Sequence, residues 1–195
     1  MNTKSVKFIF CLKICLIGFI AFGQKNIHHR WNNQLKTYVS EGGKVNYNAW
    51  KKDQKNLNAY IETLSDFPPR EGASKNYKLA YWINTYNSLT IKLILENYPV
   101  KSIKEIKSPW NTKCFKTGDK EYSLGDIEHK ILRKMNEPRI HFAINCASVS
   151  CPKLLNSAFQ EKQLENQLIQ ATRSFLMDSS KNNLNNKLLI NITGA

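Results

Sequence analysis

Apolar side chains recur at helical spacing over residues 75–98, and this segment is the clearest helix that the sequence predicts. In KNYKLAYWINTYNSLTIKLILENY they occupy almost the whole circumference of a helix. A helix that is apolar on nearly every side is usually buried, and Pro99 ends it. We therefore expect this helix at the centre of the fold. The other segments with helical periodicity are residues 31–39, 50–64, 126–135 and 160–177.

Two short segments have the pattern of β-strands. Residues 139–145, RIHFAIN, alternate apolar and polar positions, and residues 187–192, KLLINI, form an apolar run of strand length. Helices and strands do not alternate regularly, which favours an α+β fold over a parallel α/β fold. We predict one helix-rich domain with a small sheet over residues 24–195, compatible with a papain- or transglutaminase-like architecture. The chain stops directly after the second predicted strand, so we expect a truncated C-terminus.

The first 23 residues have the pattern of a secretory signal peptide. Lys4 and Lys7 precede the apolar run of residues 8–23, which ends in small residues. Lys13 interrupts this run, and a membrane span needs about 20 apolar residues. We therefore predict cleavage near residue 23, no stable membrane span afterwards, and a secreted or periplasmic domain; the alternative is that the segment stays uncleaved as an anchor.

The chain is strongly basic, and this changes the range of expected partners. Its formal net charge is +14, which falls to +11 on cleavage because the leader holds three lysines and no acidic residue. Such a charge favours anionic envelope polymers, peptides or lipid surfaces. The lysines are spread along the chain without a basic run or interleaved aromatic residues, so nucleic-acid binding is not predicted.

Three cysteines remain after cleavage: Cys114, Cys146 and Cys151. An oxidising compartment favours pairing, but an odd number leaves at least one thiol free or paired with another chain. The C-x4-C spacing of Cys146 and Cys151 differs from the C-x2-C spacing of zinc ribbons and of thioredoxin-like sites. We therefore predict neither a metal nor another cofactor, and a redox role is weaker than the alternatives.

Cys146 is the candidate nucleophile, because it ends the first predicted strand and precedes small residues that allow close approach of a substrate. A thiol nucleophile needs a nearby base such as histidine. His129 is the first candidate, since it lies near the start of a predicted helix, where the neutral imidazole is favoured. His141 is the second candidate. The alternative for Cys146 is a small buried side chain or a disulfide with Cys151.

Asn84, Asn87 and Glu128 are the polar residues that could orient a catalytic group. Asn84 and Asn87 lie three residues apart on one face of the predicted central helix. A buried amide must find hydrogen-bond partners, so each either ties a loop to the core or orients a base or substrate. Glu128 precedes His129 directly.

Three phrases of the chain, taken together, resemble the DUF547 domain family: WINTYNSLTIKLILENYPVKSI, YSLGDIEHKILR and EPRIHFAINCASVSCPKL. The resemblance runs from about residue 76 to 159. It implies that bacterial members are secreted, in agreement with the predicted signal peptide, and that members continue beyond residue 195 with another helical segment. The residues that it marks as typical of the family are Asn84, Asn87, Glu128, His129, His141, Cys146 and Cys151.

Two functions follow as hypotheses. In the first, the protein is a secreted cysteine-dependent hydrolase or acyltransferase that acts on amide or ester bonds of an envelope peptide or polymer. Cys146 is then the nucleophile, and Asn84 or Glu128 orients the histidine. In the second, it is a non-catalytic envelope module for binding or structure, in which a Cys146–Cys151 disulfide staples a turn.

Overall fold

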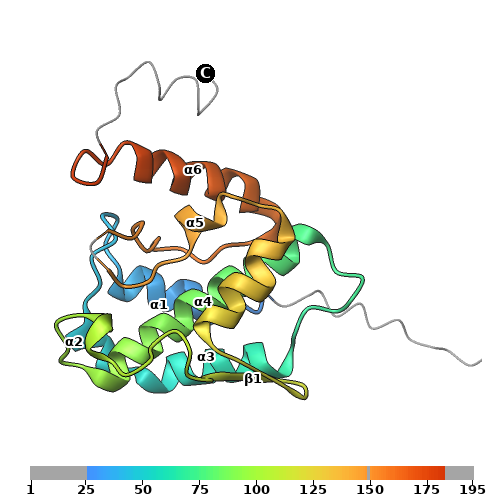
Figure 1. Ribbon diagram of the computed structural model, residues 1–195, viewed down its shortest axis with the longest axis horizontal. Helices are drawn as coiled ribbons and strands as arrows, with labels where there is room; N and C mark the ends of the chain where they lie inside the picture. The colour runs from blue at the N-terminus through green and yellow to red at the C-terminus, as the bar shows by residue number, and fades with distance from the viewer. Residues whose placement is uncertain (1–25, 149, 183–195) are drawn as a thin grey trace, which may run out of the picture.

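Helix α4 (Lys75–Asn97) runs through the middle of the protein, as its apolar circumference predicts (Figure 1). The computed structural model describes residues 26–148 and 150–182, which form one helix-rich domain. Every residue of α4 from 79 to 91 except Trp82 is buried. The hydroxyl of Ser74 caps the helix by accepting a hydrogen bond from the backbone N–H of Tyr77.

Shorter helices surround α4. Figure 1 shows α3 and strand β1 along one side of α4, and α5 and α6 along the opposite side. The other α-helices of the described residues are α1 (His29–Tyr38), α2 (Tyr47–Lys51), α3 (Gln54–Asp66), α5 (Ile140–Ala143) and α6 (Leu164–Leu176). The short 3-10 helices are η1 (Ile103–Glu105), η3 (Leu132–Met135) and η4 (Glu161–Gln163), and η2 (Asp126–Ile131) is a π-helix.

A stack of aromatic rings joins the first three helices. Trp31 of α1 lies between Trp50 of α2 and Tyr60 of α3, with both ring centroids 5.6 Å from its own. All three side chains are fully buried. Large buried aromatic rings contribute strongly to stability, so this stack fixes α1 and α2 against α3.

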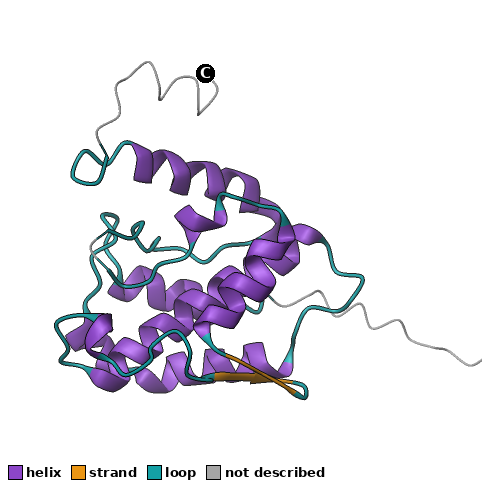
Figure 2. Cartoon of the chain, viewed as in Figure 1, coloured by secondary structure: helices purple, strands orange, loops and turns teal. Residues whose placement is uncertain are grey.

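The sheet is small, as predicted, but other residues form it. Strands β1 (Phe115–Thr117) and β2 (Lys120–Tyr122) make an antiparallel hairpin, with Phe115 opposite Tyr122 (Figure 2). The sequence analysis missed this hairpin, although Gly118 between the strands, with φ +56°, is a turn signal that it could have used. Phe115 and Tyr122 pack edge-on against Trp82, the partly exposed residue of α4.

The prediction of a strand over residues 139–145 is wrong, because Ile140–Ala143 forms the helical turn α5. The buried residues Ile140, Ala143 and Ile144 have the spacing i, i+3, i+4 of a helix. Over so short a segment this spacing coexists with an alternating pattern. The predicted strand over residues 187–192 and the predicted signal peptide lie outside the described residues.

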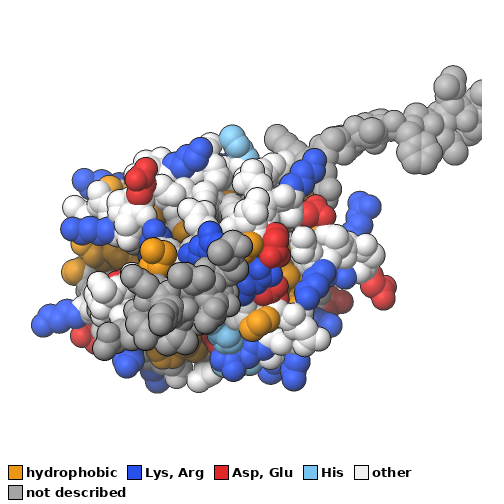
Figure 3. Space-filling view, turned by 90° about the horizontal axis from the view of Figure 1, so that it is seen from above, with side chains coloured by type: hydrophobic (Ala, Val, Ile, Leu, Met, Phe, Trp, Pro, Cys, Tyr) orange, Lys and Arg blue, Asp and Glu red, His pale blue; other side chains and the backbone are white. Residues whose placement is uncertain are grey.

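Basic side chains are scattered over the surface. Figure 3 shows Lys and Arg side chains in several places on the face that it presents, with acidic side chains among them. The positive charge of the chain is therefore distributed rather than gathered on this face.

Across residues 26–148 and 150–182, every helix is too short or too polar to span a membrane.

Candidate functional site

Asn87 of α4 holds the backbone that leads into the cysteine loop. Its Nδ2 donates to the carbonyl of Ala143 at 3.0 Å, and its Oδ1 accepts from the N–H of Asn145 at 2.8 Å. The side chain is 2% exposed. The amide thus satisfies the backbone on both sides of Ile144 in the way that a neighbouring strand would.

Asn84, one helical turn earlier, holds the other end of the same segment. Its Nδ2 donates to the carbonyl of Phe159 at 2.8 Å, and its Oδ1 accepts from the N–H of Phe159 at 3.0 Å. Buried amides need such partners. The two asparagines therefore fix residues 143–145 and residue 159, between which the cysteine loop projects.

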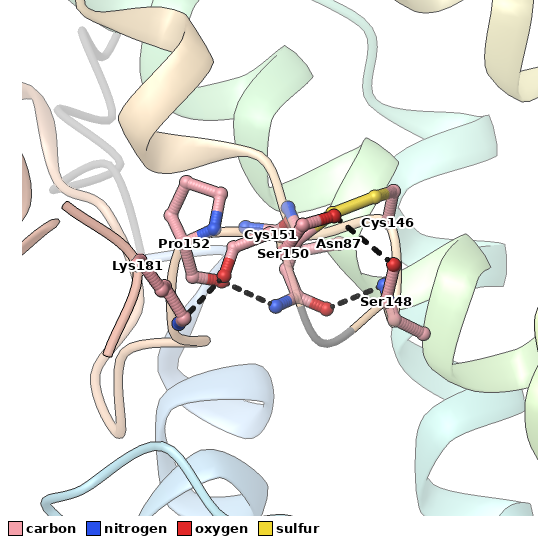
Figure 4. The surroundings of a disulfide bond; sticks show 9 residues. Asn87, Cys146, Ser148, Ser150, Cys151, Pro152 and Lys181 are labelled. Carbon is pink, nitrogen blue, oxygen red and sulfur yellow. Dashed lines mark hydrogen bonds between the residues drawn. A yellow bond between two sulfur atoms is a disulfide. The ribbon is translucent and has the colours of Figure 1, made fainter.

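The cysteine loop, residues 145–152, is closed by a disulfide between Cys146 and Cys151, whose Cα atoms lie 6.1 Å apart (Figure 4). Asn145 organises it from within: its Nδ2 donates to the carbonyl of Pro152 at 2.6 Å, and its Oδ1 accepts from the N–H of Ala147 at 2.9 Å. This second bond is an Asx turn. Ala147 has φ +55°, a left-handed conformation that is costly for alanine and is held here by the surrounding bonds.

Two lysines attach the cysteine loop to its neighbours. Lys181 donates to the carbonyl of Cys151 at 2.9 Å, as Figure 4 shows. Lys153, directly after the loop, donates to the carbonyl of Glu41 at 3.2 Å. Gly43 has φ +81°, and a Cβ there would overlap the side chain of Lys153. The loop is therefore packed against the turn that follows α1.

Glu128 and His129 lie on the π-helix η2. Glu128 accepts a hydrogen bond from Arg133 at 2.9 Å, whereas the Nδ1 of His129 is 4.0 Å from the same carboxylate oxygen. The side chain of His129 is 59% exposed, and His141 on α5 is exposed as well. Within the described part of the chain, no hydrogen bond joins either histidine to Cys146.

Asp126 is the first residue of the same helical segment, and its carboxylate pairs with Ser123, three residues earlier. Ser123 and Asp126 form a capping box: the N–H and hydroxyl of Ser123 each donate to the Asp126 carboxylate at 2.9 Å, and the Ser123 hydroxyl accepts from the Asp126 N–H at 3.1 Å. Lys113 and Lys130 also pair with this carboxylate. Hydrogen bonds from the two lysines, followed by those from Ser123, hold the pKa of Asp126 far below its ordinary value.

The arrangement brings some of the predicted site residues together and separates others. Asn87 reaches the residue before Cys146, and Cys146 is bonded to Cys151. Glu128, His129 and His141 belong to other elements, and Asn84 is occupied by the backbone of Phe159. Among the residues that the structure describes, no three His, Cys, Asp or Glu side chains come together as a metal site requires.

Sequence reasoning missed the role of Asn145. An asparagine followed by small residues is typical of an Asx turn, and this feature of the sequence could have indicated the role of Asn145.

The fold and this site define a helical domain whose cysteine loop is held by two buried asparagines. The family model of DUF547, described as a protein of unknown function, matches residues 70–176. This is more than half of the 195 residues, and the chain belongs to this family. A search of curated proteins gives no match. No solved structure matches either, so none supports a papain- or transglutaminase-like fold.

Proposed function

We propose that this protein is a non-catalytic binding module, and that the Cys146–Cys151 disulfide keeps its cysteine loop in a fixed shape. The disulfide is the single observation that carries this proposal. The thiolate is the nucleophile of cysteine chemistry, and a sulfur that is bonded to a second sulfur is not a thiolate.

The bonds of the surrounding polar residues support a structural role. Backbone groups of the loop and its flanks form the hydrogen bonds made by the side-chain amides of Asn84, Asn87 and Asn145. Glu128 is bonded to Arg133 rather than to a histidine. A catalytic histidine is ordinarily oriented by a third group and lies within hydrogen-bond reach of its nucleophile, whereas both histidines are exposed.

The disulfide also supports export. Structural disulfides persist in oxidising compartments and are rare in the cytosol, and the N-terminal sequence has the pattern of a signal peptide. We therefore propose that the protein works in the periplasm or outside the cell, where its net positive charge favours an anionic envelope polymer as partner.

The competing hypothesis is a cysteine-dependent hydrolase, and it requires a different chemical state of Cys146. It requires a reduced Cys146 with a pKa below about 8.5 and a histidine that moves to it. The substitution His129→Ala or His141→Ala should then slow alkylation of Cys146.

One experiment separates the two hypotheses. The full chain, purified without reductant, is treated with iodoacetamide over a range of pH, and each cysteine is followed by mass spectrometry. We expect Cys146 and Cys151 to stay unlabelled until a reductant is added, and the intact mass to be two hydrogen atoms below that of the reduced protein. Fast labelling of Cys146 without reductant, slowed by His129→Ala, would overturn the binding-module proposal.

A further inference from the structure

An open groove of 550 Å³ lies beside helices α1 and α2. Its walls come from the end of α1, the turn over residues 39–46, the start of α2, and Tyr98, which directly follows α4. The volume lies within the about 300–1,000 Å³ of sites for small ligands. Apart from Tyr98, the groove lies before the segment that the family model matches.

Three tyrosine rings line this groove, and each packs on another aromatic ring. Tyr38 stacks on the buried Trp50 with 5.1 Å between centroids, and its hydroxyl donates to Asp53 at 3.1 Å. Tyr47 stacks on Tyr98 with 6.2 Å between centroids. Rings that are fixed before binding lose little conformational entropy when a ligand arrives.

The turn over residues 39–46 is equally well held. Backbone hydrogen bonds join Ser40 to Lys44 at 3.0 Å and Asn46 to Tyr38 at 2.8 Å. The outer side of this turn rests on Lys153, which follows the cysteine loop. The groove therefore has a preformed wall that Lys153 contacts from outside.

The charge of the groove has one sign. Lys36 and Lys44 are exposed in its lining, and none of the described residues that line it is acidic. Asp53 lies behind Tyr38, where it accepts hydrogen bonds from Tyr38 and Asn56. A ligand with negative charges is favoured by this lining.

We propose that this groove binds a linear polysaccharide that carries carboxylate groups. Sugar rings pack against the exposed parts of Tyr47 and Tyr98, whose rings also stack on each other, and the carboxylates pair with Lys36 and Lys44. Hydroxyl and amide groups such as those of Thr37 and Asn48 meet the sugar hydroxyls. The proposal rests on the proposed binding function and names its ligand class.

An acidic peptide fits this groove less well. Acidic peptide motifs are typically recognised by clusters of arginine, whereas the charged residues of this lining are lysines. The exposed lining otherwise consists of hydroxyl and amide groups around flat rings, which match the hydroxyl groups and flat faces of sugars. We therefore commit to the polysaccharide and make the peptide an outcome of the test.

The test titrates the full, oxidised chain with polygalacturonate and follows heat or aromatic fluorescence. Neutral dextran and poly-glutamate are the comparison ligands. We expect saturable binding of polygalacturonate and at least about tenfold weaker binding of the other two. Thr37→Trp fills the groove from an exposed position without removing a lining ring, and it should abolish binding.

Matched variants locate the site. Tyr47→Ala and the pair Lys36→Gln with Lys44→Gln should each weaken binding about tenfold. Lys162→Gln removes one positive charge, half of what the pair removes, from an exposed position outside the groove, and it should leave affinity unchanged. Thermal melting shows that each variant is folded.

Four results would overturn the proposal. These are an equal loss of affinity in Lys162→Gln, equal binding of dextran, equal binding of poly-glutamate that depends on the same variants, and no binding by the oxidised protein. If the oxidised protein does not bind, the alkylation experiment can still show an intact disulfide. Such a result would contradict the ligand class and not the structural role of the disulfide.

Discussion

Asn84 and Asn87 do for isolated backbone segments what a neighbouring strand does inside a sheet. Each offers one donor and one acceptor to backbone that would otherwise be buried without partners. A hydrophobic side chain in either place would leave a carbonyl and an N–H unpaired, which costs more than a hydrogen bond contributes. At the residue scale, the loop is therefore specified by two amides on α4.

Asn87→Ala should lower the free energy of unfolding by about 3 kcal/mol, because it leaves the Ala143 carbonyl and the Asn145 N–H buried without partners. Urea unfolding measures the change. Asn97→Ala is the matched control: its amide lies on the same helix but is exposed, and it donates to the carbonyl of Leu93. Equal effects of the two substitutions would contradict the role given to Asn87.

His28 provides a second prediction at the residue scale. It is 4% exposed and its Nδ1 lies 2.7 Å from the hydroxyl of Tyr60. Among residues 26–148 and 150–182, its Nε2 has no hydrogen-bond partner. Burial lowers the pKa of His28 from 6.5 to about 4. Between these two pKa values the unfolded chain binds a proton that the folded protein does not bind. The free energy of unfolding therefore falls as the pH falls.

The expected loss from His28 is about 2 kcal/mol between pH 7.5 and pH 5. Urea unfolding at the two values measures it, and His28→Gln should remove this part of the pH dependence. Carboxylates titrate in the same range and remain in both proteins. His29→Gln changes an exposed neighbour and should leave the dependence unchanged; the same slope in His28→Gln and the unaltered protein would refute the assignment.

At the scale of the element, the cysteine loop and the turn over residues 39–46 form one unit. The disulfide and Asn145 shape the loop, and Lys153 joins it to the carbonyl of Glu41. Residues far apart in the sequence thus meet at the wall of the groove.

Replacing both Cys146 and Cys151 by serine should lower the free energy of unfolding by about 2 kcal/mol, since the disulfide closes a loop with a sequence separation of only 5. Urea unfolding without reductant measures the loss. Reductant should then destabilise the unaltered protein and leave the double variant unchanged. A double variant as stable as the oxidised protein would show that the hydrogen bonds alone shape the loop.

The elements that the sequence predicts well are those with a long periodic pattern. Helix α4 and most of the surrounding helices could be read from apolar spacing. The structure of residues 139–145 could not be predicted in this way, because Ile140 and Ile144 lie on one face both in a single turn of helix and in a short strand. The bonds from Asn84 to Phe159 and from Asn87 to Asn145 span 75 and 58 residues, and no local pattern encodes such a distance. Whether Cys146 is free or forms a disulfide likewise depends on how the folded chain holds the cysteine loop, and no local pattern encodes this.

At the scale of the whole molecule, the disulfide and the N-terminal sequence give one account of where the protein works. A cytosolic protein would hold Cys146 and Cys151 mainly as thiols, and an exported one would hold them as a disulfide. The first 23 residues have the composition of a leader. The redox state of the cysteine loop is therefore a test of the proposed export.

Expression of the full chain in a bacterium should yield a protein outside the cytoplasm that begins near residue 24 and has its disulfide formed. Ile17→Arg places a charge in the middle of the apolar run, so it should keep the chain in the cytoplasm, uncleaved and with reduced cysteines. Cell fractionation, N-terminal mass and alkylation measure these three properties together. Asn58→Arg adds the same charge at an exposed position of α3 and should leave export intact. An exported chain that keeps its first 23 residues would instead identify them as a membrane anchor, and a reduced, cytoplasmic product of the unaltered chain would remove the support that export gives to the structural disulfide.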